Sequence, residues 1–313
     1  MAKFLCITLN PAIDMTVGLD EIKVGGINRQ QYMLTHAAGK GLNVAQVLHD
    51  LGHEVAVSGF LGRGNAAVFQ AHFAAMGFAD HFVYVDGDTR YNVKIAEESG
   101  RMTDINGKGF TVSESAKTEL LEKITELAAQ ADFVAVSGSL PQQFDNNDLQ
   151  TLLGRLKKGN PRVAVDTSGA ALAAAVACSP FLIKPNTDEL RESFNMPADT
   201  AAEQAALLAT LDAGIEHAVV SMGADGVNWL HQGRCLHASA AKVAVKSTVG
   251  AGDTLMAGML HGIASGFTPE ENLRTAAALA ANAVSQVGFR IPDTQRLAQL
   301  KQNITIQTES LSS

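Results

Sequence analysis

Cysteine is scarce in this 313-residue chain, which contains only three. Cys6, Cys178 and Cys235 lie far apart and are odd in number, so they provide no disulfide framework of the kind found in small secreted domains. None has a cysteine or histidine partner at metal-ligand spacing, and the nine histidines show no such spacing among themselves. We therefore expect a protein of the reducing cytoplasm, without a cysteine or histidine metal centre.

The chain also has fewer positively charged residues than negatively charged ones, and its hydrophobic runs are short. The chain has 24 Lys and Arg against 32 Asp and Glu, a formal net charge of −8, which argues against nucleic acid and membrane surfaces as partners. An anionic substrate would need a local cluster of cations. The longest apolar run, at about residues 170–183, is interrupted by Ser179-Pro180 and is too short to span a bilayer. The apolar N-terminal stretch is broken by Asn10-Pro11, so we expect no signal peptide.

Two common nucleotide-binding motifs are absent. Gly39-Lys40 is followed by Gly41, where a Walker A loop needs Ser or Thr, and the upstream glycine of that loop is missing. Gly250 and Gly252 lack the third glycine of the dinucleotide-binding fingerprint. The sequence therefore supports neither a P-loop ATPase nor a Rossmann dehydrogenase.

What the chain does contain is a regular alternation of short apolar runs with helical patterns. Apolar runs predict buried strands at about residues 4–9, 55–60, 133–136, 162–166, 181–183 and 218–221. Helices are predicted between them, including 113–130, 146–158 and 200–213, and two more close the chain at about 250–265 and 270–286. Strands that alternate with helices predict an α/β fold with a parallel, doubly wound sheet.

Three other segments do not follow this alternation. Residues 15–35 and 89–105 alternate in polarity and carry the turn signals Gly25-Gly26 and Ser99-Gly100, so we interpret them as a small accessory sheet. A hairpin-like stretch is expected at residues 227–245, and the Ser-rich end is expected to be frayed from about Thr305.

Residues 247–254, with the sequence STVGAGDT, combine a small-residue turn with an apolar, helix-compatible run that follows. Unpaired N–H groups at a helix start, together with the helix dipole, favour an anion. Asp253 in such a site suits the removal of a proton from a group that reacts with the anion, as phosphoryl transfer requires. The alternative is a tight turn in which Asp253 only caps the helix.

A second motif, AGKGLNVA at residues 38–45, opens an amphipathic helix. It resembles the N-terminal signature of the ribokinase-like (PfkB) sugar kinases, and residues 247–260 resemble their C-terminal signature. Similar segments are NPAID at 10–14, TRYNVK at 89–94, SGSLP at 137–141 and KPNTDE at 184–189. The resemblance covers roughly residues 3–292. It implies a single ribokinase-like kinase domain over residues 1–313, with a β lid from about 11–35 and 88–106.

The resemblance also implies roles for residues at the reacting and nucleotide ends of a site. Asp253 matches the catalytic base, and Gly250, Ala251 and Gly252 match the anion hole that stabilises charge on the transferred phosphate. Glu189, in an Asn-x-x-Glu motif, matches a carboxylate that organises Mg²⁺ through water, with a helix-start glutamate as the alternative. The residues that match nucleotide-contacting positions are Lys184, Asn186, Ser221, Gly223, Gly226, Ser247 and Asn282.

Other residues match the sugar end of the family's site. Asp14, Gly39 and Asn43 match residues that hold sugar hydroxyls, and Ser139 is a further substrate-binding candidate. Lys40, Arg29 and Arg90 could meet a phosphate already present on the substrate, since Arg offers a bidentate fork and Lys a point charge. Lys94 is a less central candidate. For each cation the alternative is a solvated surface residue.

The resemblance is strongest to the phosphosugar branch of the family, which implies an ATP- and Mg²⁺-dependent kinase. The first expectation is phosphorylation of fructose 1-phosphate on its C6 hydroxyl. Tagatose 6-phosphate and fructose 6-phosphate remain alternatives, and a non-catalytic sugar-phosphate sensor is a further one that an intact base disfavours. Exposed strand edges of the lid predict a homodimer joined through the two lids.

Overall fold

The computed structural model describes residues 1–211, 214–286 and 290–310. Its large sheet has eleven strands in the order β15-β14-β13-β12-β11-β10-β9-β1-β4-β5, with β6 paired to β4. The parallel strands are β1 (Lys3–Thr8), β4 (Glu54–Gly62), β5 (Ala79–Asp80), β6 (Val83–Val85), β9 (Phe133–Ser137), β10 (Val163–Asp166), β11 (Leu182–Ile183) and β12 (His217–Ser221). The predicted doubly wound parallel sheet is confirmed.

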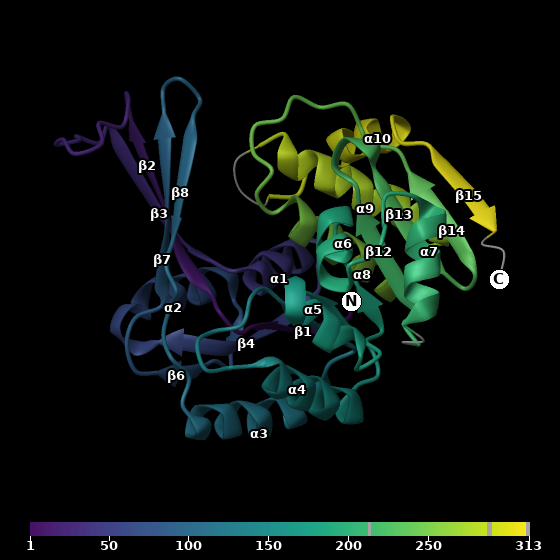
Figure 1. The fold of residues 1–313 in the computed structure, drawn as a ribbon, viewed down its shortest axis with the longest axis horizontal. Coiled ribbons are helices and arrows are strands. Elements are labelled where there is room, and N and C mark those ends of the chain that lie inside the picture. The colour runs from purple at the N-terminus through teal and green to yellow at the C-terminus, as the bar shows by residue number, and fades with distance from the viewer. Residues whose placement is uncertain (212–213, 287–289, 311–313) are drawn as a thin grey trace.

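Helices cover both faces of this sheet (Figure 1). They are α1 (Lys40–Asp50), α2 (Ala67–Met76), α3 (Glu114–Gln130), α4 (Asn146–Gly159), α5 (Gly169–Val176), α6 (Thr187–Phe194), α7 (Ala201–Thr210), α8 (Ala251–Ala264), α9 (Pro269–Val284) and α10 (Thr294–Gln302). Successive residues of β1 point to opposite faces. Phe4 and Cys6 join the apolar cluster under α1, α8 and α9, whereas Leu5 and Ile7 join the cluster under α3 and α4.

The strand order reverses at β1. The chain continues to β4 on one side of β1 and later builds β9 to β12 on the other. The carboxyl ends of β1, β9, β10 and β12 lie at Thr8, Ser137, Asp166 and Ser221. Open α/β sheets hold their ligands in the crevice at such a switch point.

A separate four-stranded sheet stands away from the main body at this edge (Figure 1). It consists of β3 (Tyr32–Ala38), β2 (Ala12–Leu19), β7 (Arg90–Glu97) and β8 (Met102–Asn106), in that order. The accessory sheet predicted from alternating polarity is therefore present, and β3 extends to Ala38, beyond the expected end. We call it the small sheet.

The C-terminal part of the chain differs most from the expectations. The hairpin is shorter than predicted, with β13 (Val227–His231) and β14 (Arg234–Ala238) joined by a tight turn. Fraying from Thr305 was wrong, because β15 (Ile306–Ser310) pairs antiparallel with β14. Its polar side chains are mostly exposed, so main-chain hydrogen bonds to the sheet edge hold it in place without an apolar pattern. The last two residues of the helix predicted at 200–213 lie outside the described residues.

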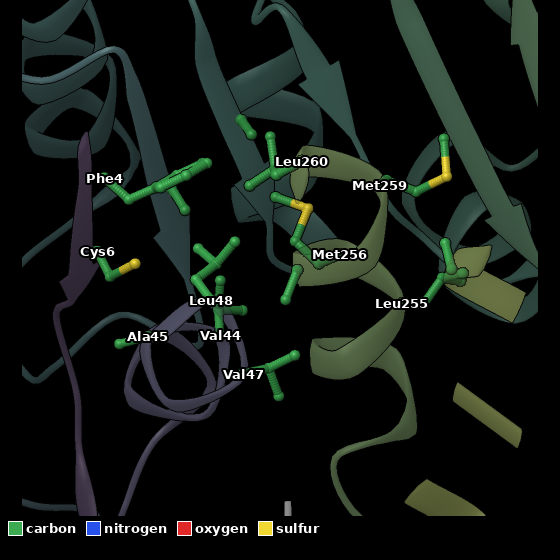
Figure 2. Packing of buried hydrophobic residues seen from close by; sticks show 14 of the residues in the cluster. Phe4, Cys6, Val44, Ala45, Val47, Leu48, Leu255, Met256, Met259 and Leu260 are labelled. Atoms are coloured by element: carbon green, nitrogen blue, oxygen red, sulfur yellow. The ribbon is translucent and has the colours of Figure 1, made fainter. Parts of the chain in front are cut away.

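Helix α8 joins the 247–254 motif to the core. Its N-cap, Gly250, has φ 79° and ψ −2°, a left-handed conformation that glycine adopts at little cost. Figure 2 shows buried side chains of β1, α1 and α8 in one cluster, among them Phe4, Val47 and Met256. The apolar run after Asp253 thereby fixes the start of α8 beside α1. Within the described residues, no helix is both long and apolar enough to cross a membrane.

The contact between α8 and α9 predicts a sensitive position. A Cβ on Gly258 would lie 2.7 Å from Ala276 Cα, so Gly258→Ala forces the two helices apart. Overpacking of this kind costs about 1–3 kcal/mol, more than the gain in helix propensity. We expect a lower melting temperature by scanning calorimetry. The control is Gly154→Ala in α4, where a Cβ meets nothing within 4 Å and the free energy of unfolding should rise. An equal change in melting temperature in both variants would contradict the close contact between α8 and α9.

Candidate active site

A cleft of about 500 Å³ opens at the carboxyl ends of the strands, between the large and small sheets. It is lined by residues from both sequence signatures and from the segments between them. Thirteen predicted site residues line it: Asp14, Gly39, Lys40, Asn43, Arg90, Lys94, Lys184, Asn186, Glu189, Ser221, Gly250, Gly252 and Asp253. The structure thus brings together residues that the sequence separates widely.

Asp253 lies in the first turn of α8, with only 5% of its surface exposed. Asn43 Nδ2 donates a hydrogen bond to its Oδ2 at 2.7 Å. Burial and the neighbouring charge of Asp166 raise the pKa of Asp253 from 3.8 to about 6, against the opposing effects of Asn43, Lys40 and Lys184. A carboxylate with a pKa near the operating pH is suited to accept a proton.

Asp166, at the end of β10, is the main residue that the sequence reasoning missed. Its carboxylate is buried, and Lys40 Nζ and Lys184 Nζ each lie 3.5 Å from its Oδ1. Burial lowers the pKa of Lys40, but the charges of Asp166, Asp253 and Glu189 outweigh burial and raise it. The position of Asp166 at a strand's carboxyl end was an available signal.

The glycines of the AGKGLNVA motif allow α1 to start close to β1. Gly39 has φ 147°, and a Cβ there would lie 2.7 Å from Thr8 Cγ2. A Cβ on Gly41 would lie 2.7 Å from the carbonyl oxygen of Ile7. The N-terminus of α1, with Lys40 and Asn43, therefore sits directly against the end of the central strand.

The small sheet supplies the other wall of the cleft. Asp14 accepts hydrogen bonds from Asn92 Nδ2 at 3.1 Å and Lys94 Nζ at 3.2 Å, so both of its oxygens are oriented. Asn92, Asp104 and Asn106 also line the cleft and were not predicted. Alternation along β2, β7 and β8 places these side chains on one face of the small sheet.

Arg90 begins β7 at the base of the small sheet. Its guanidinium donates to the carbonyl oxygens of Asn10 (3.1 Å), Pro11 (3.3 Å) and Gly107 (3.4 Å). Burial lowers the pKa of Arg90, while Asp14 acts in the opposite direction. Arg90 thus faces the cleft and also holds two of the connections that join the small sheet to the main body.

Glu189 and Asn186 form a reciprocal cap at the start of α6. The Glu189 N–H donates to Asn186 Oδ1 at 2.7 Å, and the Asn186 N–H donates to Glu189 Oε2 at 2.9 Å. The helix-start alternative for Glu189 is therefore present in the structure. The same carboxylate also lines the cleft.

Seven predicted site residues lie outside the lining of the cleft. Ser139 accepts a hydrogen bond from Asn10 Nδ2 at 3.2 Å, and Asn282 Nδ2 donates to the carbonyl of Arg290 at 3.1 Å. Arg29 is exposed in the loop between β2 and β3. The full set is Ala251, Arg29, Ser139, Gly223, Gly226, Ser247 and Asn282.

Away from the cleft, Glu216, His217 and His231 bring possible ligand atoms within 4.8 Å of one another. Trp229 Nε1 donates to His217 Nδ1 at 3.3 Å, so a neutral His217 carries its proton on Nε2, 3.5 Å from Glu216. Burial and His231 lower the pKa of His217 to about 3, which keeps the ring neutral. A metal at Nε2 would have to displace that proton, so hydrogen bonding explains this group better than metal binding.

Residues 5–296 match the pfkB family carbohydrate kinase profile, and the chain belongs to this family. The 1-phosphofructokinase of Vibrio cholerae is 41% identical over 305 residues, which cover 97% of this chain and 96% of that protein. The 1-phosphofructokinase of Escherichia coli K12 is 39% identical over 303 residues, covering 96% and 97%. A crystal structure of phosphofructokinase-2 from Escherichia coli in complex with potassium superposes with a TM-score of 0.88 at 26% identity, covering 96% and 99%. The chain is accordingly an enzyme, a carbohydrate kinase.

The raised pKa of Asp253 predicts how its removal affects stability. Above pH 6 the folded protein carries a charge that burial disfavours, whereas below pH 3.8 the group is protonated in both the folded and unfolded states. Asp253→Asn keeps the size and removes the charge, so it should raise the free energy of unfolding above pH 6 by on the order of 2–3 kcal/mol. The gain should shrink as the pH falls through 6 towards 4. Melting temperatures measured from pH 4 to 8 check this, and a pH-independent difference would contradict it.

Proposed function

We propose that this kinase transfers the γ-phosphate of ATP to the C6 hydroxyl of fructose 1-phosphate, giving fructose 1,6-bisphosphate and ADP. The observation that carries the proposal is the cleft itself. It has a buried carboxylate, Asp253, at one helix start, and the cations Arg90 and Lys94 on the opposite, small-sheet wall. The curated relatives named 1-phosphofructokinase support this choice of substrate.

In this mechanism Asp253 is the general base. Its free oxygen accepts the hydroxyl proton as the sugar oxygen bonds to the γ-phosphorus, and the bond from that phosphorus to the bridging oxygen of ADP breaks. The N–H groups of Gly250, Ala251 and Gly252 at the start of α8 stabilise the charge on the transferred phosphate. Lys40 and Lys184, both held by Asp166, add positive charge at this end of the cleft.

The nucleotide end is formed by the carboxyl edge of β11 and β12 and the segments that follow. We assign to it the residues Lys184, Asn186, Ser221, Gly223, Gly226, Ser247 and Asn282. Glu189 presents a carboxylate to the cleft, which fits Mg²⁺ because that ion keeps several waters and uses few protein ligands. When bound, Mg²⁺ would neutralise phosphate charge, and Glu189 would hold it through water.

The sugar lies between the two walls. Asp14, Gly39, Asn43 and Ser139 are proposed to contact its hydroxyls, since carboxylate and amide groups together accept and donate hydrogen bonds. Arg90, with Lys94, anchors its phosphate, and we propose Arg29 as a further contact from the loop of the small sheet. Lys40 lies beside Asp166 at the reacting end of the cleft. We therefore assign Lys40 to the phosphate that is transferred from ATP, and not to the phosphate that the sugar already carries. Tagatose 6-phosphate and fructose 6-phosphate fit the same anchor and remain the alternatives.

The whole chain, residues 1–313, is proposed to act as one kinase domain with the small sheet as its lid. The face of the small sheet turned from the cleft carries Met33, Tyr91 and Ile105, which are 49%, 40% and 56% exposed. Exposed apolar side chains beside open strand edges favour pairing with a second copy. We therefore expect a homodimer through the lids. Light scattering at assay concentration should give a molecular mass of twice 32.9 kDa. The mass of a monomer would contradict the proposed homodimer.

A coupled ADP-release assay tests the proposed reaction. Fructose 1-phosphate should give the highest kcat/KM in a panel with fructose 6-phosphate, tagatose 6-phosphate and fructose. Asp253→Asn should lower kcat by at least ~10²-fold, the scale of lost general-base catalysis. Glu189→Gln should raise the Mg²⁺ concentration needed for half-maximal rate. No turnover of any sugar phosphate would overturn the proposal.

Arg90→Ala, measured in the same assay, separates phosphate binding from support of the small sheet. A hydrogen bond to a charged group is worth about 1.5–3 kcal/mol, so kcat/KM for fructose 1-phosphate should fall roughly 10- to 150-fold. Turnover of unphosphorylated fructose should change little. Equal losses on both sugars would mean that the backbone contacts of Arg90 are what the reaction needs.

A further inference from the structure

One hydrogen bond joins the two sequence signatures at the wall of the cleft. Asn43, in the first turn of α1, donates from Nδ2 to Asp253 Oδ2 at 2.7 Å over a separation of 210 residues. Asn43 is only 9% exposed and Asp253 5%, so water competes little for either group. A short bond from an amide to a buried carboxylate is charge-assisted and directional.

The bond distinguishes the two oxygens of the carboxylate. Among the described residues, the side-chain hydrogen bond to Asp253 reaches Oδ2, which leaves Oδ1 for a ligand in the cleft. A carboxylate held at one oxygen cannot rotate freely, so the lone pair of the other oxygen keeps one direction. A general base needs this, because proton transfer depends on a donor–acceptor distance of about 2.6–3.2 Å.

The charges around Asp253 give the amide a second effect. Asp166, at the end of β10, repels the ionised carboxylate, whereas Lys40 from α1 and Lys184 after β11 attract it. The Asn43 hydrogen bond favours the ionised form, together with the two lysines. Burial and Asp166 raise the pKa of Asp253, and without the amide only the two lysines would lower it. A larger fraction of Asp253 would then be protonated near neutral pH.

We propose that Asn43 is a positioning residue for the base, which holds Asp253 by Oδ2 so that Oδ1 faces the reacting hydroxyl. This rests on the proposed role of Asp253 and adds to the sugar contact that the family resemblance implies for Asn43. The remaining N–H and the Oδ1 of Asn43 can still meet a sugar hydroxyl. Asn43 would then align the acceptor hydroxyl and the base with one side chain.

Two roles for Asn43 predict different kinetics. A residue that only contacts the sugar affects KM, whereas one that orients the base lowers kcat at saturating sugar. Asn43→Leu has nearly the same shape and removes the donor. We expect kcat to fall roughly 10- to 150-fold, the range for one hydrogen bond to a charged group. We also expect the acid limb of the kcat–pH profile to move to higher pH.

The same helix offers a matched control. Gln46 is also 9% exposed on α1, and its Nε2 donates to a carboxylate, Asp50 Oδ1, at 2.9 Å. Gln46→Leu removes an equivalent bond outside the cleft, so kcat and the acid limb should stay at the wild-type values. A second variant, Asn43→Asp, keeps the shape but places an acceptor opposite Asp253, and its acid limb should move further than that of Asn43→Leu.

The experiment measures kcat, KM and pH profiles for these variants and for Asn43→Leu combined with Asp253→Asn, after thermal melts confirm folding. If Asn43 acts through the base, Asn43→Leu costs little once Asp253 is replaced. A raised KM with unchanged kcat and acid limb in Asn43→Leu and Asn43→Asp would overturn the proposal and leave only a sugar contact. Wild-type turnover in Asp253→Asn alone would instead refute the base assignment, which separates that failure from failure of the positioning role.

Discussion

Burial of one ionisable carboxylate is the constraint on which the site depends. Asn43, Lys40 and Lys184 favour the ionised form of Asp253, and together with Asp253 they come from three parts of the chain: α1, the end of β11 and α8. Their convergence requires α1, α8 and the end of β11 to meet at one edge of the sheet. Two features bring these elements together: α1 packs against α8 through apolar side chains, and α1 approaches β1 closely at Gly39 and Gly41. The hydrophobic core therefore stabilises an arrangement that the charges alone would not.

Much of the fold was predictable because its signals are periodic. Strands such as β1 and β9 are buried on both faces and appear as continuous apolar runs, while the polarity of β2 and β7 alternates because one face meets the cleft. The C-terminal strand β15 was missed for a physical reason. It contributes backbone hydrogen bonds to the edge of β14 and few buried side chains, so its residues carry no pattern.

The site was predictable to a different degree. Short motifs and the family resemblance identified Asp253, Asn43 and Lys184, which the structure places around one cleft. Asp166 was missed because its importance comes from two lysines that reach it from helix α1 and from the segment after β11, and a single sequence does not show such contacts. Glu189 illustrates the opposite case. Its capping bond is local and could be anticipated, whereas its exposure to the cleft depends on the tertiary fold.

The contacts of Arg90 have a consequence for ligand selection. Its N–H groups already donate to three backbone carbonyls, at Asn10, Pro11 and Gly107. Any ligand that draws the guanidinium away must offset the loss of those bonds and the disturbance of the connections that carry them. Hydrogen bonds from a guanidinium to a phosphate are about twice as strong as those between neutral groups, so a phosphate offsets that loss better than a neutral hydroxyl does. The connections that flank the small sheet thus compete with any ligand for the N–H groups of Arg90.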